Sequence, residues 1–398
     1  MRDSRRLSPL LLTLALATGP LAACSTASND TRPAATSPSG SSTSSPGAAP
    51  VRLVTHLTQP RRVEVDEVIR IDATDGELRS VRVESPAGPL AGRLQGGTWT
   101  STARLEPGTR YRISGQVIDA EGAEQQLTST FRTRDLTLDE QTYAAIAPLD
   151  GETVGVGMPA IVTFDLPVRD KNTFERHMTV TSSPSQQGSW HWISDTEAHW
   201  RPATYWQPGT DVTVDVDVNS LPAGGGVFGQ ESRSVTFHVG DSVISKVNAQ
   251  THQMQTFVNG QLARTMPITT GKEGFTTRSG VKVIIEKFDV KRMNSETVGI
   301  PQGSSEAYDI DDVQWAMRVT YSGEFIHAAP WSVGSQGVAN VSHGCTGMSV
   351  ENAKWLYDHS KRGDVVEYTG TDRAMTLTNG YGDWNTDFAS YAAGSALH

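Results

Sequence analysis

Residues 212–218 read Val-Thr-Val-Asp-Val-Asp-Val, so apolar and polar side chains alternate at every position. A period of two is typical of an antiparallel strand with one face in a core and the other in water. No long amphipathic helix pattern occurs before residue 240. Shorter alternating runs occur on both sides of this stretch, at residues 63–65, 81–83, 111–113 and 235–239, and alternation continues within residues 243–268. The sequence therefore predicts a mostly β protein.

A weak repeat divides the first 240 residues. Trp99 and Trp200 are each followed eight residues later by Pro-Gly-Thr, then by an alternating strand, and each unit closes on a phenylalanine strand at Phe131 or Phe237. The offset of about one hundred residues matches one sandwich domain. We therefore expect two immunoglobulin-like β-sandwiches in series, at residues 51–135 and 136–240, with the joint at residues 135–140.

The composition excludes several classes of protein. The formal net charge of -10 argues against binding to nucleic acid through a phosphate footprint. The two cysteines, Cys24 and Cys345, are too few for a disulfide scaffold or a Cys-rich metal site. The second unit is rich in aromatic and histidine side chains, which would suit a sugar platform or a metal site, but core packing is the favoured interpretation. These side chains are Trp190, His191, Trp192, His199, Trp200, Tyr205 and Trp206.

The N-terminus has the pattern of an export signal. Basic residues lie at Arg2, Arg5 and Arg6, and a short apolar run over residues 10–21 leads to Ala22-Ala23-Cys24. This ending resembles the bacterial lipobox, which implies cleavage after residue 23 and lipidation of Cys24; an ordinary secretory signal is the alternative. Residues 24–50 are dominated by small and polar side chains and are expected to be a disordered tether. We therefore expect a lipoprotein on the outer face of the cell membrane.

Chemistry-bearing residues gather in the third part of the chain, residues 241–370. Residues 321–327 are expected to form a strand that ends in His327, and Ser342-His343-Gly344-Cys345 follows after fourteen intervening residues. A helix is expected from an N-cap at Ser349 to a stop at Gly363. Residues 371–398 form a C-terminal extension.

Cys345 is the candidate nucleophile, because lipidation of Cys24 would leave it without a disulfide partner. A thiol becomes reactive when a nearby histidine takes its proton, and a helix N-terminus close by would stabilise the negative charge. Either His327 or His343 can be the base. Gly344 allows a sharp turn that would direct main-chain amides toward a substrate oxyanion. The alternative is that these residues are not catalytic, with Cys345 an inert buried cysteine and both histidines part of the core.

The block from His327 through Cys345, with the string YSGEFIHAAPWSVG over residues 321–334, resembles the signature of L,D-transpeptidases of the mycobacterial type. The resemblance implies a β-rich catalytic domain, with no metal or organic cofactor. It implies Cys345 as nucleophile, His327 as base, the Ala328 carbonyl as the group that orients this base, and His343 and Gly344 in the oxyanion region. Tyr308 and Met293 would lie on a mobile lid over residues 289–323, and Trp331 and Ser342 beside the substrate.

The implied reaction is a 3→3 cross-link between peptidoglycan stem peptides, by way of a thioester on Cys345, in the service of cell-wall organisation and cell shape. Carbapenems are the implied inhibitors, and the two sandwiches would be a stalk for a monomeric enzyme that reaches into the wall. An L,D-carboxypeptidase, a protein-anchoring transpeptidase and a non-catalytic wall-binding lipoprotein remain alternatives. The family usually has Asn where this chain has Gly347, and we hypothesise that Gly347 loosens the loop after Cys345.

Overall fold

The computed structural model describes residues 50–397. The expected signal peptide, Cys24 and the tether up to residue 49 lie outside the described residues. The first domain is a sandwich of two four-stranded sheets, with the orders β1-β2-β6-β5 and β4-β3-β7-β8. Its core lies between the sheets, where Tyr111 and Phe131 stack at a centroid distance of 4.8 Å. The strands are β1 (Arg52–Thr55), β2 (Arg70–Thr74), β3 (Gly76–Ser85), β4 (Gly88–Pro89), β5 (Gly92–Gln95), β6 (Thr98–Ser101), β7 (Arg110–Asp119) and β8 (Glu124–Arg132).

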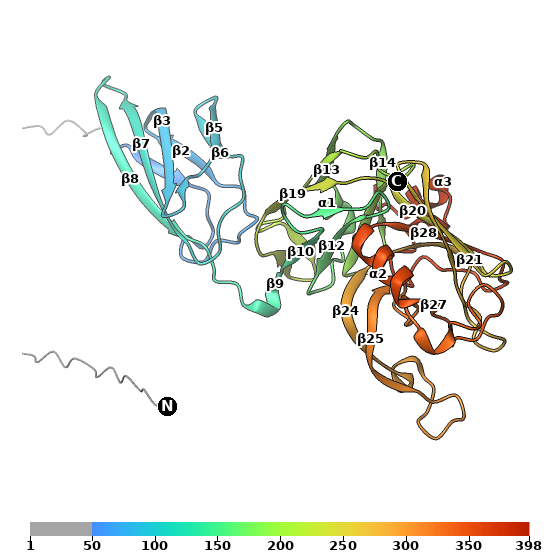
Figure 1. Cartoon of the computed structure of the whole chain (residues 1–398). Coiled ribbons are helices and arrows are strands. Elements are labelled where there is room, and N and C mark those ends of the chain that lie inside the picture. The colour runs from blue at the N-terminus through green and yellow to red at the C-terminus, as the bar shows by residue number, and fades with distance from the viewer. Residues whose placement is uncertain (1–49, 398) are drawn as a thin grey trace, which may run out of the picture. The chain divides into compact units, whose positions relative to one another are not determined.

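The second domain (green in Figure 1) is also a sandwich. Its sheet orders are β10-β12-β15-β14 and β11-β19-β16-β13, with a small third sheet, β17-β18-β9. A 3-10 helix, η1 (Leu138–Glu140), precedes it, and it contains one short helix, α1 (Lys171–Glu175). The strands are β9 (Gln141–Thr142), β10 (Ala144–Ala147), β11 (Thr153–Val154), β12 (Ala160–Phe164), β13 (Met178–Ser183), β14 (Gly188–Trp192), β15 (Glu197–Pro202), β16 (Asp211–Val216), β17 (Pro222–Gly224), β18 (Val227–Gly229) and β19 (Arg233–Val239).

The sequence repeat is a structural repeat. Gly108 and Gly209 both have a positive φ, 58° and 79°, which glycine adopts without strain. Their amides donate to carbonyls near the ends of the closing strands: Gly108 to Arg134, two residues beyond β8, and Gly209 to Val239, the last residue of β19, each at 2.8 Å. The strand expected at residues 63–65 is wrong, because Val63 forms only an isolated bridge to Thr133. The alternation there reflects burial of two valines beneath a turn rather than a ladder of hydrogen bonds.

The catalytic domain pairs a five-stranded sheet, β22-β21-β20-β28-β23, with a four-stranded sheet, β24-β25-β26-β27. Figure 1 shows β24 and β25 side by side as a long hairpin. Helix α2 (Val350–His359) packs against β25 and β26. The strands are β20 (Val243–Asn248), β21 (Gln253–Val258), β22 (Gln261–Pro267), β23 (Gly280–Val283), β24 (Glu286–Asn294), β25 (Asp309–Arg318), β26 (Phe325–Ala328), β27 (Thr346–Met348) and β28 (Val365–Thr369). The 3-10 helices are η2 (Ser295–Val298) and η3 (Pro330–Ser332).

The predicted N-cap of α2 is confirmed, since Ser349 Oγ accepts from the amide of Asn352 at 3.2 Å. The predicted stop at Gly363 is wrong, because α2 ends at His359. Ser360 has an extended backbone, and the Lys287 ammonium donates to the carbonyls of Tyr357 and Ser360 at 2.6 and 2.5 Å. These carbonyls would otherwise be left without partners at the helix end. Lys287 of β24 therefore satisfies the end of the helix four residues before Gly363.

The C-terminal extension returns to the second domain with η4 (Asp383–Asn385) and α3 (Phe388–Ala392). Asp383 is fully buried and its carboxylate accepts from His199 Nδ1 at 2.9 Å. Burial lowers the pKa of His199, but Asp383 and Glu197 outweigh it and raise this pKa to about 9. Among the described residues no group of three His, Cys, Asp or Glu side chains is arranged to hold a metal.

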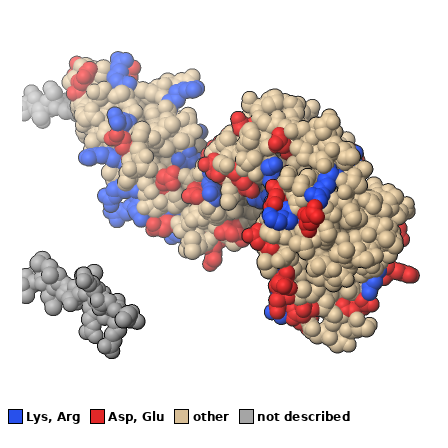
Figure 2. Space-filling model, in the orientation of Figure 1, with Lys and Arg blue, Asp and Glu red and all other residues tan. Residues whose placement is uncertain are grey.

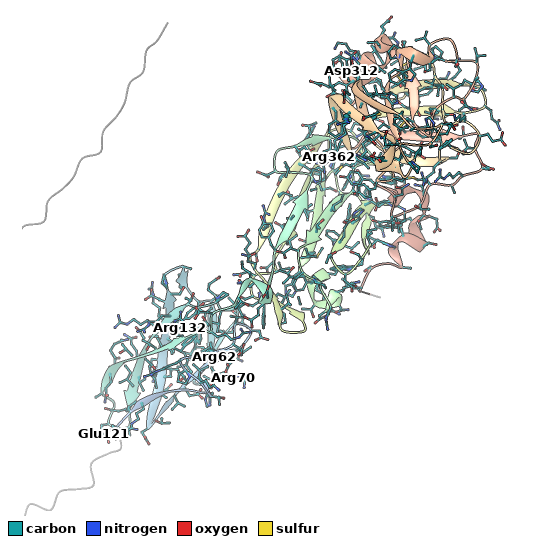
Figure 3. All side chains as sticks on the ribbon, turned by 90° about the horizontal axis from the view of Figure 1, so that it is seen from below. Arg62, Arg70, Glu121, Arg132, Asp312 and Arg362 are labelled. Carbon is teal, nitrogen blue, oxygen red and sulfur yellow. The ribbon has the colours of Figure 1, made fainter. Side chains whose placement is uncertain are left out.

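Core packing is confirmed for the tryptophans of the second domain, which are buried in one cluster with residues of the catalytic domain. Arg362 lies at the junction of these two domains (Figure 3), where its guanidinium pairs with Glu152 at 3.0 Å. The amides of Gly155 and Gly157 donate across the same junction to the carbonyls of Arg362 and Gly363. The catalytic domain is thus fixed to the second sandwich by backbone contacts as well as side chains.

On the face shown in Figure 2, basic and acidic side chains are intermixed, as on an ordinary solvated surface. Within residues 50–397, the helices are all too short or too polar to cross a membrane.

Candidate active site

Two parallel strands bring the candidate base and nucleophile to one edge of a sheet. In the pair β26–β27, His327 lies opposite Gly347, and Cys345 directly precedes β27. The strand expected from residue 321 is shorter than predicted, because residues 319–324 form a turn closed by the Val319 amide on the Glu324 carbonyl at 3.0 Å. Gly323 takes a φ of 96° in this turn. His327 is inside the strand and not at its end.

His327 is held as a neutral base. Its side chain is buried, and Nδ1 lies 2.7 Å from the Ala328 carbonyl. A carbonyl can only accept, so Nδ1 carries the proton and Nε2 keeps a free lone pair. Burial lowers the pKa of His327, and its bond to Ala328 opposes this in part. The imidazole is therefore neutral at pH 7 and is able to take a second proton through Nε2.

Cys345 is held as a neutral thiol. The residue is half-buried, and burial raises the pKa of its thiol to about 11. Sγ donates to the carbonyl of Gly323 at 3.7 Å. The expected assistance from a helix N-terminus is wrong, because the three residues of β27 separate the cysteine from α2. Three strand residues span about 10 Å, whereas the helix dipole acts only near the first turn.

The turn before Cys345 is locked by hydrogen bonds. Gly344 has a φ of 120°, as expected of a sharp turn. Its amide donates to Ser342 Oγ at 3.1 Å, and the Ser342 hydroxyl donates to the Cys345 carbonyl at 2.6 Å. The Gly344 amide is thus already bonded and is not directed at a substrate oxyanion, contrary to expectation. Ser342 lines the cleft, but its hydroxyl is used in hydrogen bonds within the loop.

His343, the second candidate base, is bound to the lid. Its Nε2 lies 2.6 Å from Glu306 Oε2, and its ring packs against Phe275 and Tyr308 at centroid distances of 4.7 and 5.2 Å. Glu306 also pairs with Lys272 at 2.5 Å. The hydrogen bonds from Lys272 and His343 lower the pKa of the Glu306 carboxyl. Between the two histidines, the geometry favours His327 as the base.

The expected lid, residues 289–323, is a hairpin for much of its length, in which β24 pairs with β25 from Glu286–Arg318 to Asn294–Asp309. Its side chains roof a cleft of about 320 Å³ that holds both His327 and Cys345. Met293 and Tyr308 come from the lid side. Burial and the neighbouring Cys345 raise the pKa of Tyr308 to about 12, so its hydroxyl stays a donor.

The rest of the cleft is lined by residues on both sides of the expected motif. Trp331 forms part of the wall, with its ring 5.9 Å from that of His327 and more than half of its surface exposed. Thr269, Ile310, Val313 and Val341 also line the cleft, although no sequence pattern singled them out. Glu306 and Lys272 were also missed, because polar residues in a lid sequence carry no signal of a long-range ion pair.

Gly347 does not loosen the loop, contrary to the hypothesis. It lies in β27 and is buried, and it exchanges two hydrogen bonds of 2.9 Å with Thr269. A Cβ at this position would lie only 2.9 Å from the Cβ of Ala329. The site is therefore built closely around the glycine.

Two family models match the chain. One describes a bacterial Ig domain and covers residues 60–222, across the boundary expected between the two sandwiches. The other describes an L,D-transpeptidase catalytic domain and covers residues 242–367, which includes the whole cleft.

Individual relatives agree with these matches. L,D-transpeptidase 2 of Mycobacterium tuberculosis is 36% identical over 343 residues, which are 84% of this chain and 82% of the relative. L,D-transpeptidase 5 of the same species is 32% identical over 83% of this chain and 73% of the relative. A solved L,D-transpeptidase structure in complex with imipenem is 36% identical and covers 57% of this chain and 98% of its own, with a TM-score of 0.51.

Proposed function

We propose that this chain, which belongs to the L,D-transpeptidase family, makes 3→3 cross-links in peptidoglycan through a thioester on Cys345. Membership of the family makes the chain a transferase that acts on peptidoglycan. The observation that carries the finer proposal is the 2.7 Å contact of His327 Nδ1 with the Ala328 carbonyl. It leaves Nε2 as an acceptor in the cleft that also holds Cys345.

In the first step, Cys345 Sγ attacks the carbonyl carbon of the third residue of a tetrapeptide stem. The S–C bond forms, and His327 Nε2 takes the thiol proton. The C–N bond to the terminal D-Ala then breaks, and the same proton passes to the leaving amine. A thiol pKa of about 11 beside a base of lowered pKa favours proton transfer during the attack over a preformed ion pair.

In the second step, the side-chain amine of a diaminoacid on a neighbouring stem attacks the thioester. The new C–N bond forms, the C–S bond breaks, and the amine proton returns to Sγ by way of His327. The oxyanion of each step needs donors. The Tyr308 hydroxyl is the side-chain candidate, because it lines the cleft with Cys345 and stays protonated at neutral pH. No metal or organic cofactor takes part in this scheme.

The test is mass spectrometry of the protein with a disaccharide tetrapeptide. We expect an acyl adduct on Cys345, with loss of D-Ala, followed by a cross-linked dimer. The matched control is Cys345→Ser, which keeps the size of the side chain but should form neither. Hydrolysed tripeptide without dimer would indicate an L,D-carboxypeptidase, and transfer only to a protein amine would indicate an anchoring enzyme. Intact tetrapeptide with folded protein would indicate a non-catalytic wall-binding protein and refute the proposal.

Carbapenems should acylate the same thiol. The solved relative in complex with imipenem supports this. A β-lactam carbonyl resembles the acyl donor, but its leaving amine stays tethered, so the adduct keeps the mass of the intact drug. We expect this adduct on Cys345 and its absence in Cys345→Ser.

We further propose that the protein is a monomeric lipoprotein, cleaved after residue 23 and anchored by Cys24 to the outer face of the cell membrane. The lipobox-like ending at Cys24 and the small, polar tether after it support this. Cys24→Ala should move the protein from the membrane fraction to the soluble fraction. An unchanged membrane fraction would refute the anchor.

A further inference from the structure

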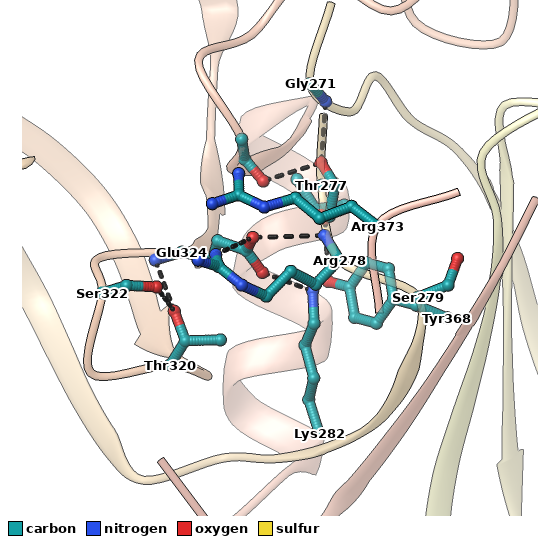
Figure 4. A network of polar contacts seen from close by, with 12 residues as sticks. Gly271, Thr277, Arg278, Ser279, Lys282, Thr320, Ser322, Glu324, Tyr368 and Arg373 are labelled. Atoms are coloured by element: carbon teal, nitrogen blue, oxygen red, sulfur yellow. Dashed lines mark hydrogen bonds and ion pairs between the residues drawn. The ribbon is translucent and has the colours of Figure 1, made fainter. Parts of the chain in front are cut away.

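Figure 4 shows a cluster of charged side chains that pair with Glu324, all of them largely buried. Lys282 has no exposed side-chain surface, and its Nζ pairs with Glu324 Oε2 at 2.5 Å. The other carboxylate oxygen of Glu324 accepts from Arg278 Nη1 at 2.8 Å. Desolvation makes such a buried pair a poor source of stability compared with apolar side chains of the same size. The cluster therefore calls for a role other than stability.

Glu324 is connected to the nucleophile through its own backbone. It directly follows Gly323, whose carbonyl accepts from Cys345 Sγ at 3.7 Å. The backbone of Glu324 is held in place, because its amide donates to Thr320 Oγ1 at 2.8 Å. The Arg278 amide also donates to the Glu324 carboxylate at 3.2 Å. The residue that holds Lys282 is thus fixed beside the carbonyl that the thiol faces.

Lys282 and its neighbours are also linked to the residues on both sides of Cys345. Its Nζ lies 3.7 Å from the centroid of the Tyr368 ring, and the Tyr368 hydroxyl bonds to Thr346 Oγ1 at 2.8 Å. Thr346 directly follows Cys345. Thr277, one residue before Arg278, donates its hydroxyl to the carbonyl of Gly344 at 2.8 Å. Both residues that flank Cys345 therefore contact this cluster or its immediate neighbours.

We propose that Lys282 is a positioning residue whose buried ammonium group stabilises the Cys345 thiolate as it forms, and that Glu324 holds the ammonium in place. The proposal rests on the proposed function only in that Cys345 is the nucleophile. Charges interact strongly in a buried, low-dielectric site. Burial lowers the pKa of Lys282 to about 8 although Glu324 opposes this, so the ammonium is charged at pH 7.

The charges around the thiol act in opposite directions. After burial, which is the largest effect, Glu324 raises the pKa of Cys345, whereas Lys282 and Arg318 lower it. Arg318 is partly exposed and is paired with Glu286. Arg278 is also charged, but its guanidinium is paired with Glu324. His327, Tyr308 and Tyr368 are neutral at pH 7 and supply no positive charge before the reaction begins.

The experiment measures alkylation of Cys345 by iodoacetamide between pH 6.5 and 7.5, where a pKa of about 8 leaves Lys282 mostly charged. Lys282→Met keeps the length of the side chain and removes the charge. We expect it to react about three- to tenfold more slowly, since one unit of thiol pKa changes the thiolate fraction tenfold and greater nucleophilicity returns part of the loss. Adding Glu324→Gln to Lys282→Met should restore most of the rate. Lys354→Met, which removes a surface lysine paired with Asp358, should change nothing.

A merely structural cluster would behave differently. If Lys282→Met stays within twofold of Lys354→Met, or if the folded double variant is no faster than Lys282→Met, the proposal is wrong. If Lys282→Met does not fold, Glu324→Gln is compared with the double variant at pH 6.5, because these two also differ only at Lys282. Equal rates there would overturn the proposal. Alkylation needs no peptidoglycan, so failure of cross-linking in the wild-type protein would count against the proposed function and leave this result standing.

Discussion

Gly347→Ala should destabilise the two strands that carry the active site. The added Cβ would lie 2.9 Å from the Cβ of Ala329 and 3.1 Å from Cγ2 of Thr269, whereas carbon atoms in ordinary contact are about 3.5–4.0 Å apart. Neither neighbour can rotate away, because an alanine Cβ is fixed to its backbone and a β-branched threonine is stiff. The strands must therefore separate by several tenths of an ångström.

The size of the effect follows from two opposed contributions. Overpacking a close-fitting core costs about 1–3 kcal/mol. Replacing glycine by alanine at a φ that alanine tolerates stabilises by about 0.4–1 kcal/mol, through the unfolded chain. Since Gly347 does not have a positive φ, both contributions apply, and the net loss should be about 1–2 kcal/mol. This corresponds to a local opening equilibrium about 5- to 30-fold more favourable.

The assay is native-state hydrogen exchange of the amides in β26 and β27, which should exchange about 5- to 30-fold faster in Gly347→Ala. Adding Ala329→Gly to this variant removes the 2.9 Å contact and should recover most of the protection, although the 3.1 Å contact with Thr269 remains. Gly347→Asn should lose at least as much protection as Gly347→Ala. Exchange in Gly347→Ala that is no faster than in the wild-type protein would refute the packing argument and revive the hypothesis that Gly347 loosens the loop.

Three further predictions follow from the contacts of single histidines. His327→Ala should slow acylation of Cys345 by about two to four orders of magnitude in single-turnover mass spectrometry, and a larger loss in His343→Ala would show that the base is misassigned. Because its folded pKa of about 9 is above the ordinary value of 6.5, His199 should contribute its full stability below pH 6.5 and lose it as the pH rises through 9. The urea concentration at the midpoint of unfolding should therefore decrease from pH 7 to pH 9.5, and an unchanged midpoint would contradict this. Glu306→Gln should weaken the bond to His343 and speed hydrogen exchange in residues 295–308, and unchanged exchange would mean that this ion pair does not hold the lid.

Much of the site could be predicted because its signals are local. His327 lies in β26 and Cys345 directly before the neighbouring parallel strand β27, and the residues around them follow a family pattern that survives in the sequence. The alternation of β16 and β19 likewise records burial on one face, which is a property of each strand by itself. The repeat of Trp and Pro-Gly-Thr worked for the same reason, since a turn with a positive φ needs glycine wherever it occurs.

Several of the errors and omissions concern contacts between distant segments. Lys282 lies between two valines, an alternation that predicts an exposed lysine. It is buried instead, because it forms an ion pair with Glu324, which is 42 residues away in the sequence. The end of α2 depends on Lys287, and the role of His343 depends on Glu306 in the lid. Long-range pairs of this kind leave no period or motif in the sequence.

The states of the two central groups explain how a lone thiol can remain intact outside the cytoplasm, where we propose that the protein works. Oxidants and alkylating agents react with the thiolate form of cysteine. The thiolate fraction of Cys345 is small because its pKa is about 11, and the residue is half-buried. His327 is neutral and Lys282 is charged before any substrate arrives. A substrate carbonyl that is close enough for attack therefore completes the conditions for proton transfer, with Nε2 as the proton acceptor and, as we propose, the Lys282 ammonium stabilising the thiolate. The same arrangement predicts selectivity, because a carbonyl electrophile that fits the cleft should react with Cys345 far faster than a small oxidant such as hydrogen peroxide. A rate constant for peroxide that equals or exceeds the rate constant for a carbapenem at pH 7 would show that the thiol is activated in the resting protein, and the mechanism would have to begin from a preformed thiolate.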